Sequence, residues 1–306
     1  MKTRLLAIDG HPLLYRSYFQ RTVGTLKTKS RMPSGAVFGF LRSVLSLKQR
    51  FPDAHIAFAF DSGPSWRNTI LVDYKHYGTR VPPIGFADQL AAIQQFIGAV
   101  GYPILCEKGL EADDLLSVLV SRWLGYFPKH TSIIVSSDRD FFQLVTDRCA
   151  LYDDRQKRFF GPEEVACETG VYPEDYLNYK CVVGDTSDHI KGLKGYGKKK
   201  APKIALHIGE YELGFSTAEM DLFQRNHMLM LLPRQVQHLR VSTKHRQHIE
   251  ESVTRIIQRW TLQDEGRSWP MHDMTLAQAL LAKYECHSLR VEEFVEDSMH
   301  RGQRGP

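Results

Sequence analysis

The chain has 306 residues, enough for one main domain and an appendage, and its 42% hydrophobic content is enough for a buried core. Its 40 basic and 35 acidic residues give a formal net charge of +5, and no low-complexity tract indicates disorder. Five cysteines without a CxxC pair, no signal-peptide core and no long apolar run argue against a disulfide-stapled or membrane-spanning protein. We therefore expect reduced thiols, a cytoplasmic location and no membrane contact.

Three apolar segments in the first half of the chain end at acidic residues. RLLAID (4–9), AHIAFAFD (54–61) and TSIIVSSDRD (131–140) lead to Asp9, to Asp61, and to the pair Asp138 and Asp140. Each pattern predicts a buried strand, and helical patterns cover 37–49, 87–100 and 111–124. This alternation predicts an α/β fold with right-handed crossovers and a mostly parallel sheet flanked by helices.

A second acidic group begins the helix predicted at 111–124. Carboxylates suit the first turn of a helix, but Glu111, Asp113 and Asp114 fall within four residues and repel one another unless a cation lies among them. A single aspartate at a strand end often serves only as a cap. The carboxyl ends of parallel strands share one edge, where functional crevices lie, so we expect both acidic groups to meet there around cations.

The segment 172–209 contributes Asp185 and Asp188, and then a glycine-rich turn. Glycines let backbone N–H groups approach phosphate closely, and lysines add attraction that is independent of base sequence. No strand precedes the turn, which argues against a dinucleotide-binding fingerprint. We expect a clamp on a nucleic-acid backbone, made by Gly192, Lys194, Gly195, Gly197, Lys198, Lys199 and Lys200.

Basic residues are unevenly distributed along the chain. Residues 10–52 include eight lysines and arginines and no acid, and residues 191–203 include six lysines and no acid. Such blocks favour a polyanionic partner, although a solvated basic loop is a common alternative.

Aspartate and glutamate without histidine or cysteine are hard oxygen ligands, which favour Mg²⁺ or Mn²⁺ over zinc. The acids are too numerous for one Mg²⁺, and two ions suit hydrolysis of a phosphodiester. Cations are then needed to hold the scissile phosphate. Four lie near the acids in the sequence and are our candidates: Arg16, Lys75, Arg80 and Lys180.

Five ordered segments within residues 4–210 resemble the 5′-nuclease family, which includes flap endonucleases, phage 5′-exonucleases and the 5′-nuclease domain of bacterial DNA polymerase I. They are AIDGHPLLYRSY, FAFDSGPSWRNTILVDYK, GLEADDLLSVL, VSSDRDFFQLV and VVGDTSDHIKGLKGYGKKKA. The resemblance, to a stand-alone phage or bacterial type, implies a PIN-like fold and structure-specific cleavage of DNA at or near 5′ ends, in replication or repair.

The resemblance also implies roles for individual residues. Asp9, Asp61, Glu111 and Asp113 would serve a first metal site, and Asp138, Asp140, Asp185 and Asp188 a second, with Asp113 shared. Asp114 matches the third acid of the family's E-x-D-D motif and is grouped with these metal ligands. Lys75 and Arg80 match the base of the helical arch, and Arg16 and Lys180 match positions near the metal-bound phosphate. The turn at 192–200 matches a helix-hairpin-helix element, often with a K⁺ ion on its carbonyls.

We expect three regions and one class of substrate. The regions are a nuclease domain at 1–160, with an arch at about 62–88, a helix-hairpin-helix region at 161–215, and C-terminal helices at 216–306 that pack on the main domain. Pro64, Pro82 and Pro83 argue against a long helical arch. Pro202 implies that the second hairpin helix starts late or that the clamp is altered. The expected substrate is DNA with 5′ flaps, nicks or ends, bound by a monomer with a polymerase or single-strand-binding protein as a candidate partner.

Three rival functions stay open. The first is removal of RNA primers from RNA–DNA hybrids, because the acids alone do not distinguish the two sugars. The second is a structure-specific DNA-binding protein that has lost catalysis, against which the complete set of acids weighs. A metal-dependent phosphatase for small molecules is the third, and it would not need the lysine-rich turn.

Overall fold

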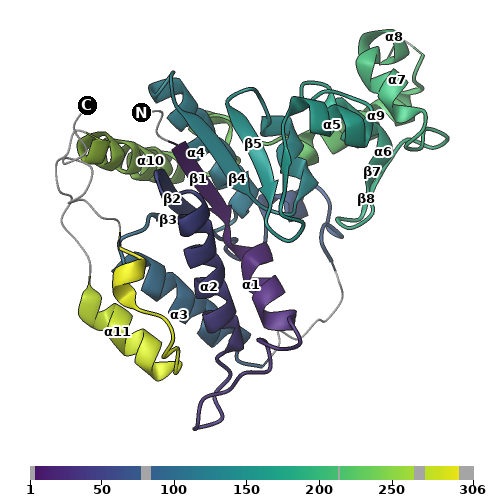
Figure 1. Ribbon diagram of the computed structural model, residues 1–306. Coiled ribbons are helices and arrows are strands. Elements are labelled where there is room, and N and C mark those ends of the chain that lie inside the picture. The colour runs from purple at the N-terminus through teal and green to yellow at the C-terminus, as the bar shows by residue number, and fades with distance from the viewer. Residues whose placement is uncertain (1–3, 77–83, 213, 265–272, 296–306) are drawn as a thin grey trace.

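The computed structural model describes residues 4–76, 84–212, 214–264 and 273–295. Its centre is a six-stranded sheet in the order β3-β2-β1-β4-β5-β6 (Figure 1). The strands are β1 (Arg4–Asp9), β2 (Ala54–Ala59), β3 (Ile104–Leu105), β4 (Thr131–Val135), β5 (Cys149–Asp153) and β6 (Arg158–Phe160). All neighbouring pairs are parallel except β5 and β6. The predicted α/β class with a mostly parallel sheet is confirmed.

Helices cover both faces of the sheet because alternate side chains of its strands point to opposite sides. Leu6 and Ile8 of β1 belong to a core with α2 (Gly35–Arg50), α3 (Phe86–Ala99) and α11 (Met274–Lys283). Leu5 and Ala7 belong to a second core with α4 (Ala112–Tyr126) and α10 (Thr243–Asp264). Helix α1 (Gly10–Phe19) leaves the end of β1 directly and packs on α2.

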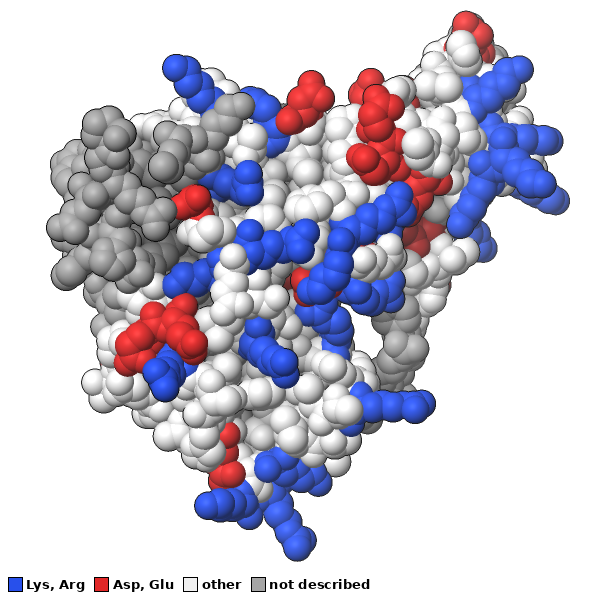
Figure 2. Space-filling view, in the orientation of Figure 1, with Lys and Arg blue, Asp and Glu red and all other residues white. Residues whose placement is uncertain are grey.

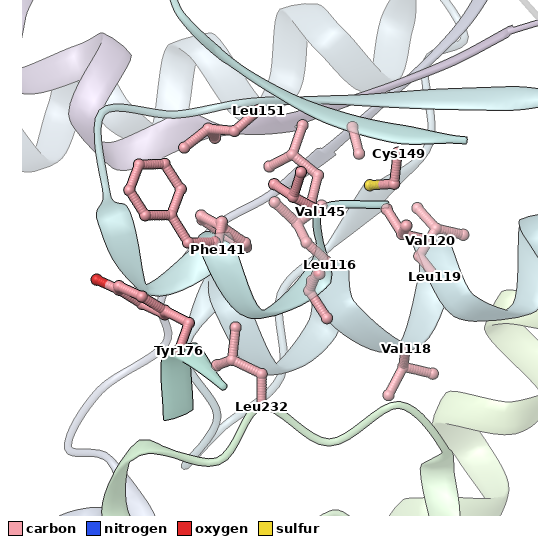
Figure 3. Close-up of a cluster of buried hydrophobic side chains, with 14 of the residues drawn as sticks. Leu116, Val118, Leu119, Val120, Phe141, Val145, Cys149, Leu151, Tyr176 and Leu232 are labelled. Atoms are coloured by element: carbon pink, nitrogen blue, oxygen red, sulfur yellow. The ribbon is translucent and has the colours of Figure 1, made fainter. Parts of the chain in front are cut away.

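The second core continues beneath the segments that follow the sheet. Figure 3 shows Leu116 of α4, Phe141 of the 3₁₀ helix η2 (Arg139–Leu144), Leu151 of β5 and Tyr176 of α6 (Tyr176–Val183) converging in one apolar cluster. All four side chains are buried. The loop after β4 and helix α6 therefore have fixed positions relative to the strand ends.

The helical region after the sheet forms a lobe on one side of the molecule (Figure 1). Its elements are α5 (Pro162–Thr169), α6, the short strands β7 (Gly184–Asp185) and β8 (Ile190–Lys191), α7 (Ala201–Leu206), α8 (Ile208–Glu212) and α9 (Thr217–Met230). Helix α6 packs on α7 and α9. Pro202 stands in the first turn of α7, where its missing N–H costs nothing, so the helix begins at Ala201 despite the proline.

The described residues between β2 and α3 contain no α-helix. The 3₁₀ helix η1 (Trp66–Thr69) is followed by turns up to His76, and α3 begins at Phe86. Further 3₁₀ helices are η3 (Val236–His238) and η4 (Val291–Glu293). No helix in the part of the chain that the structure describes has the length and apolarity needed to cross a membrane.

The late helices pack against the main sheet domain. Three apolar residues of α10, Ile249, Val253 and Ile257, are buried in the core of α4, and Ile256 is half-buried. Trp260 lies edge-on to Trp123 of α4, with 5.4 Å between their ring centroids. The division into three regions stays a prediction.

Replacing Trp260 with alanine should lower the free energy of unfolding by about 3–5 kcal/mol, because a fully buried ring leaves a cavity shared by α10 and α4. Urea denaturation followed by circular dichroism measures the change. Gln258→Ala, at an exposed position of the same helix, is the matched control and should change stability little. Equal effects of the two substitutions would contradict the packing role of α10.

Candidate metal centre

The carboxyl ends of β1, β2 and β4 bring their acids to one edge of the sheet. Asp9 ends β1 and accepts a hydrogen bond from the Ser136 hydroxyl, at 2.9 Å, just beyond β4. The same hydroxyl accepts the backbone N–H of Asp138 at 3.1 Å. Asp61 accepts the backbone N–H of Ala112 at 2.8 Å, which joins the end of β2 to the start of α4. The strand-end geometry predicted from the sequence is therefore present.

Two compact groups of carboxylates complete this edge. Glu111, Asp113 and Asp114 offer oxygen atoms within 4.8 Å of one another, and so do Asp140, Asp185 and Asp188. The first group lies at the start of α4, and the second joins η2 to the β7–β8 turn. Oxygen donors at this spacing fit divalent cations such as Mg²⁺ or Mn²⁺.

Two lysines predicted to hold phosphate lie among these acids. Lys75 forms an ion pair with Glu111, and its backbone N–H donates to the carbonyl of Asp188 at 3.3 Å. Lys180 of α6 lies 2.7 Å from an oxygen of Asp140 and also pairs with Asp185. Burial lowers the pKa of each ammonium, but the surrounding acidic groups raise it by more, so both lysines stay charged.

The neighbouring cations outweigh the effect of burial on the pKa of some of these acids but not of others. Burial raises the pKa of Glu111 and Asp185, but Arg67 and Lys75 beside Glu111, and Lys180 beside Asp185, lower it by more. Burial and Asp140 raise the pKa of Asp138 to about 7. Four of the predicted metal ligands have a pKa above their ordinary value, chiefly because of burial: Asp9, Asp113, Asp138 and Asp188. These four would gain most from added positive charge, which supports a cation site.

Arg67 is a central residue of the site that the sequence analysis missed. Its guanidinium is buried and donates two hydrogen bonds to Asp114, each 2.9 Å long, and one to Glu111 at 2.7 Å. Its Nε donates to the carbonyl of Leu229 at 2.7 Å. The sequence signal was an arginine close after Asp61, but nothing local shows that this arginine is buried.

Asp114 differs from the other acids in its contacts. It is 0% exposed, and both its oxygens accept from Arg67. One of these oxygens also accepts the backbone N–H of Glu111 and the indole N–H of Trp66, both at 3.2 Å. Direct metal coordination by Asp114 would require these contacts to change. The hydroxyls of Ser65 and Tyr74, also missed, each donate to Glu111 at 3.0 Å.

The remaining predicted residues lie around this centre. Arg16 forms a 2.6 Å ion pair with Asp154 and lines a small cavity of about 50 Å³ together with Asp9. Arg80 lies outside the described residues. At the glycine turn, a Cβ on Gly192 would lie 2.1 Å from the carbonyl oxygen of Val183, so this position requires glycine. Four lysines of the turn are exposed, namely Lys194, Lys198, Lys199 and Lys200.

The sequence shows which family this chain belongs to. The family model described as "5′-3′ exonuclease, N-terminal resolvase-like domain" matches residues 4–170, and the chain belongs to that family. Among curated relatives, it is 34% identical over 214 residues to the thermostable DNA polymerase I of Thermus thermophilus, covering 69% of this chain and 25% of the relative. It is 31% identical over 213 residues to DNA polymerase I of Mycobacterium bovis, covering 68% of this chain and 23% of the relative. The chain thus spans about a quarter of the length of these relatives.

Solved structures share the fold. One is a variant of the bacteriophage T5 flap endonuclease, as a pseudo-enzyme-product complex with DNA and metal ions. It aligns with a TM-score of 0.69 and 20% identity, over 83% of this chain and 99% of that one. The same T5 protein co-crystallised with metal ions aligns with a TM-score of 0.67 and 20% identity, over 83% of this chain and 98% of that one. The predicted PIN-like fold is confirmed.

Replacing Arg67 with methionine should destabilise the protein by about 3–5 kcal/mol, because Asp114 would stay buried without its cation. Chemical denaturation measures the loss. Arg240→Met is the matched control, since Arg240 is exposed and also lies over the Trp66 ring, 5.2 Å from its centroid. A loss no larger than that of the control would contradict the role of Arg67 as the internal counter-ion.

Proposed function

We propose that this protein is a divalent-metal-dependent nuclease that hydrolyses DNA phosphodiester bonds at or near 5′ ends. The observation that carries this proposal is one sheet edge where two groups of carboxylates adjoin the ammonium groups of Lys75 and Lys180. Carboxylates can coordinate divalent cations, and the lysine ammonium groups can bind a phosphate held beside those cations. Membership of the 5′-3′ exonuclease family supports the same reaction.

The proposed metals are two Mg²⁺ ions, for which Mn²⁺ can substitute. Asp9, Asp61, Glu111 and Asp113 would hold the first, and Asp138, Asp140, Asp185 and Asp188 the second, with Asp113 shared. When bound, such ions lower the pKa of an attacking water and stabilise the leaving oxygen. Asp114 we assign to positioning, because with Arg67 it orients Glu111 and the start of α4.

The lysines would change partners when substrate binds. In the present structure Lys75 and Lys180 neutralise Glu111, Asp140 and Asp185. Once these carboxylates coordinate cations, each ammonium is available to a phosphate oxygen at the same edge. Arg80 and Arg16 are proposed to assist at the arch and beside Asp9.

The glycine turn is proposed to grip the backbone of duplex DNA, with a K⁺ ion on its carbonyls as a further candidate ligand. The four exposed lysines of the turn support this use. The expected substrates carry 5′ flaps, nicks or ends, and the protein would act as a cytoplasmic monomer, with a polymerase or single-strand-binding protein as candidate partner. An RNA–DNA hybrid is the second candidate substrate, because the carboxylates act on either backbone.

The test uses a 5′-labelled flap duplex, a nicked duplex and an RNA–DNA hybrid, each incubated with Mg²⁺ or with EDTA. Product lengths are read on a denaturing gel. Mg²⁺-dependent fragments of flap length are expected, while a mononucleotide ladder would indicate exonuclease action. Binding without cleavage of all three, with Mn²⁺ also tried, would leave a DNA-binding protein and overturn the nuclease proposal.

Replacing Asp140 with alanine should abolish Mg²⁺-dependent cleavage and leave DNA affinity within a few-fold, because it removes one of the closely spaced oxygen donors. Cleavage and fluorescence anisotropy are measured on one flap substrate. Asp147→Ala removes an exposed acid nearby in the chain and serves as the control. Cleavage by the Asp140 variant near the wild-type rate would contradict the assignment of this ligand.

Replacing Lys75 with methionine should slow single-turnover cleavage by about 10²-fold or more, with a much smaller loss of DNA affinity. The reason is that its ammonium lies among the acids, where charge develops on the phosphate. Lys129→Met, at an exposed position, controls for lost positive charge. Equal losses in rate and affinity would make Lys75 a docking residue instead.

A further inference from the structure

A basic groove lies beside the metal centre, on the face formed by α1, α2 and the β5–β6 turn. Figure 2 shows lysine and arginine side chains gathered across this face. The groove has a volume of about 420 Å³. Its charged lining consists of Arg16 on α1, Arg42 on α2, and Asp154, Arg155 and Lys157 of the turn. Four cations against one carboxylate leave three positive charges in excess.

The one acid of the lining holds cations in place. Asp154 is 7% exposed, and its two oxygens lie 2.6 Å from Arg16 and 2.6 Å from Lys157. Arg16 also donates to the hydroxyl of Ser43, at 3.0 Å. Arg42 and Arg155 are exposed. The groove therefore has two anchored cations and two that extend into solvent.

The groove continues from the metal centre and is separate from the glycine turn. Arg16, Asp154 and Arg155 also line the small cavity that contains Asp9 and Ser136. The turn at 192–200, by contrast, lies between α6 and α7. A polyanion at the carboxylates can reach the groove along α1 without passing over the lysines of that turn.

The chemistry of the lining favours phosphates over bases. Ser43, Ser46 and Gln20 add polar side chains, and no aromatic ring belongs to the lining among the described residues. Backbone phosphates are bound by arginine, lysine and hydroxyl groups, whereas unpaired bases are bound chiefly by stacking on aromatic rings.

We propose that this groove is a second nucleic-acid interface, in which Arg42, Arg155 and Lys157 contact the phosphodiester backbone of the DNA whose 5′ end lies at the carboxylates. The inference rests on the proposed function for the identity of the polyanion. It assigns the acid-free span 10–52 a role in substrate binding beyond the metal centre and the glycine turn.

The test measures how DNA affinity depends on salt. Anisotropy with a labelled flap duplex in EDTA, over about 50–200 mM KCl, gives the slope of log K against log salt. The double variant Arg42→Gln with Arg155→Gln should reduce the magnitude of this slope by up to about 1.8, since each phosphate contact contributes about 0.9. Reversal to Glu at both positions should weaken binding further.

The matched control neutralises Lys129 and Arg255, which are exposed on other elements. Lys129 precedes β4, at the edge of the sheet opposite the carboxylates. A slope that changes equally in both double variants, or in neither, would overturn the groove as an interface.

Cleavage by the wild type separates this proposal from the proposed function. If wild type cleaves the same DNA with Mg²⁺ while the groove variants keep the wild-type slope, the nuclease stands and the groove fails. If wild type does not cleave in Mg²⁺ or Mn²⁺ but the groove variants lose slope, the interface stands and the nuclease fails.

Discussion

Repulsion among carboxylates at one edge of the sheet is the constraint around which this molecule is organised. Eight acids besides Asp114 are expected to face the same centre, and burial makes each ionised carboxylate more costly. The compensating cations come from distant parts of the chain. Arg67 and Lys75 belong to the segment after β2, and Lys180 belongs to α6. The ion pairs of Arg67 and Lys75 help to hold the segment after β2, which has little regular structure, against the strand ends.

The apolar cores on the two faces of the sheet fix where those acids can be. β1 is central and pairs with both β2 and β4, so its end cannot shift without breaking two registers. Phe141 and Phe142 follow Asp140 directly and are 0% exposed, so their burial in the core fixes the position of Asp140. Buried residues next to the acids in the chain therefore fix the positions of the acids. The acids are buried because these neighbours are.

The sequence was sufficient for features that depend on local pattern. The strand predicted at 4–9 and the helix predicted at 37–49, observed as Gly35–Arg50, follow from hydrophobic periodicity. The acids that follow the strands could be placed because parallel strands end at a common edge. Arg67 could not be placed, because its partners Asp114 and Leu229 are set by tertiary packing. Grouping Asp114 with the metal ligands followed from the motif alone, which carries no information about which acid faces a buried arginine.

Hydrogen bonds beside these charge pairs connect the segment after β2 with the region of the glycine turn, and both are expected to bind DNA. The backbone N–H of Lys75 donates to the carbonyl of Asp188, and a ring nitrogen of His189 lies 2.9 Å from the carbonyl of Asp73. The segment after β2 is thereby tied to the β7–β8 turn, which leads into the glycine turn. Lys180 joins the β7–β8 turn to η2 through its ion pairs with Asp185 and Asp140. A change in the charge at the centre would therefore act on the segment after β2, on α6 and on η2, because Lys75 and Lys180 form ion pairs with the acids there.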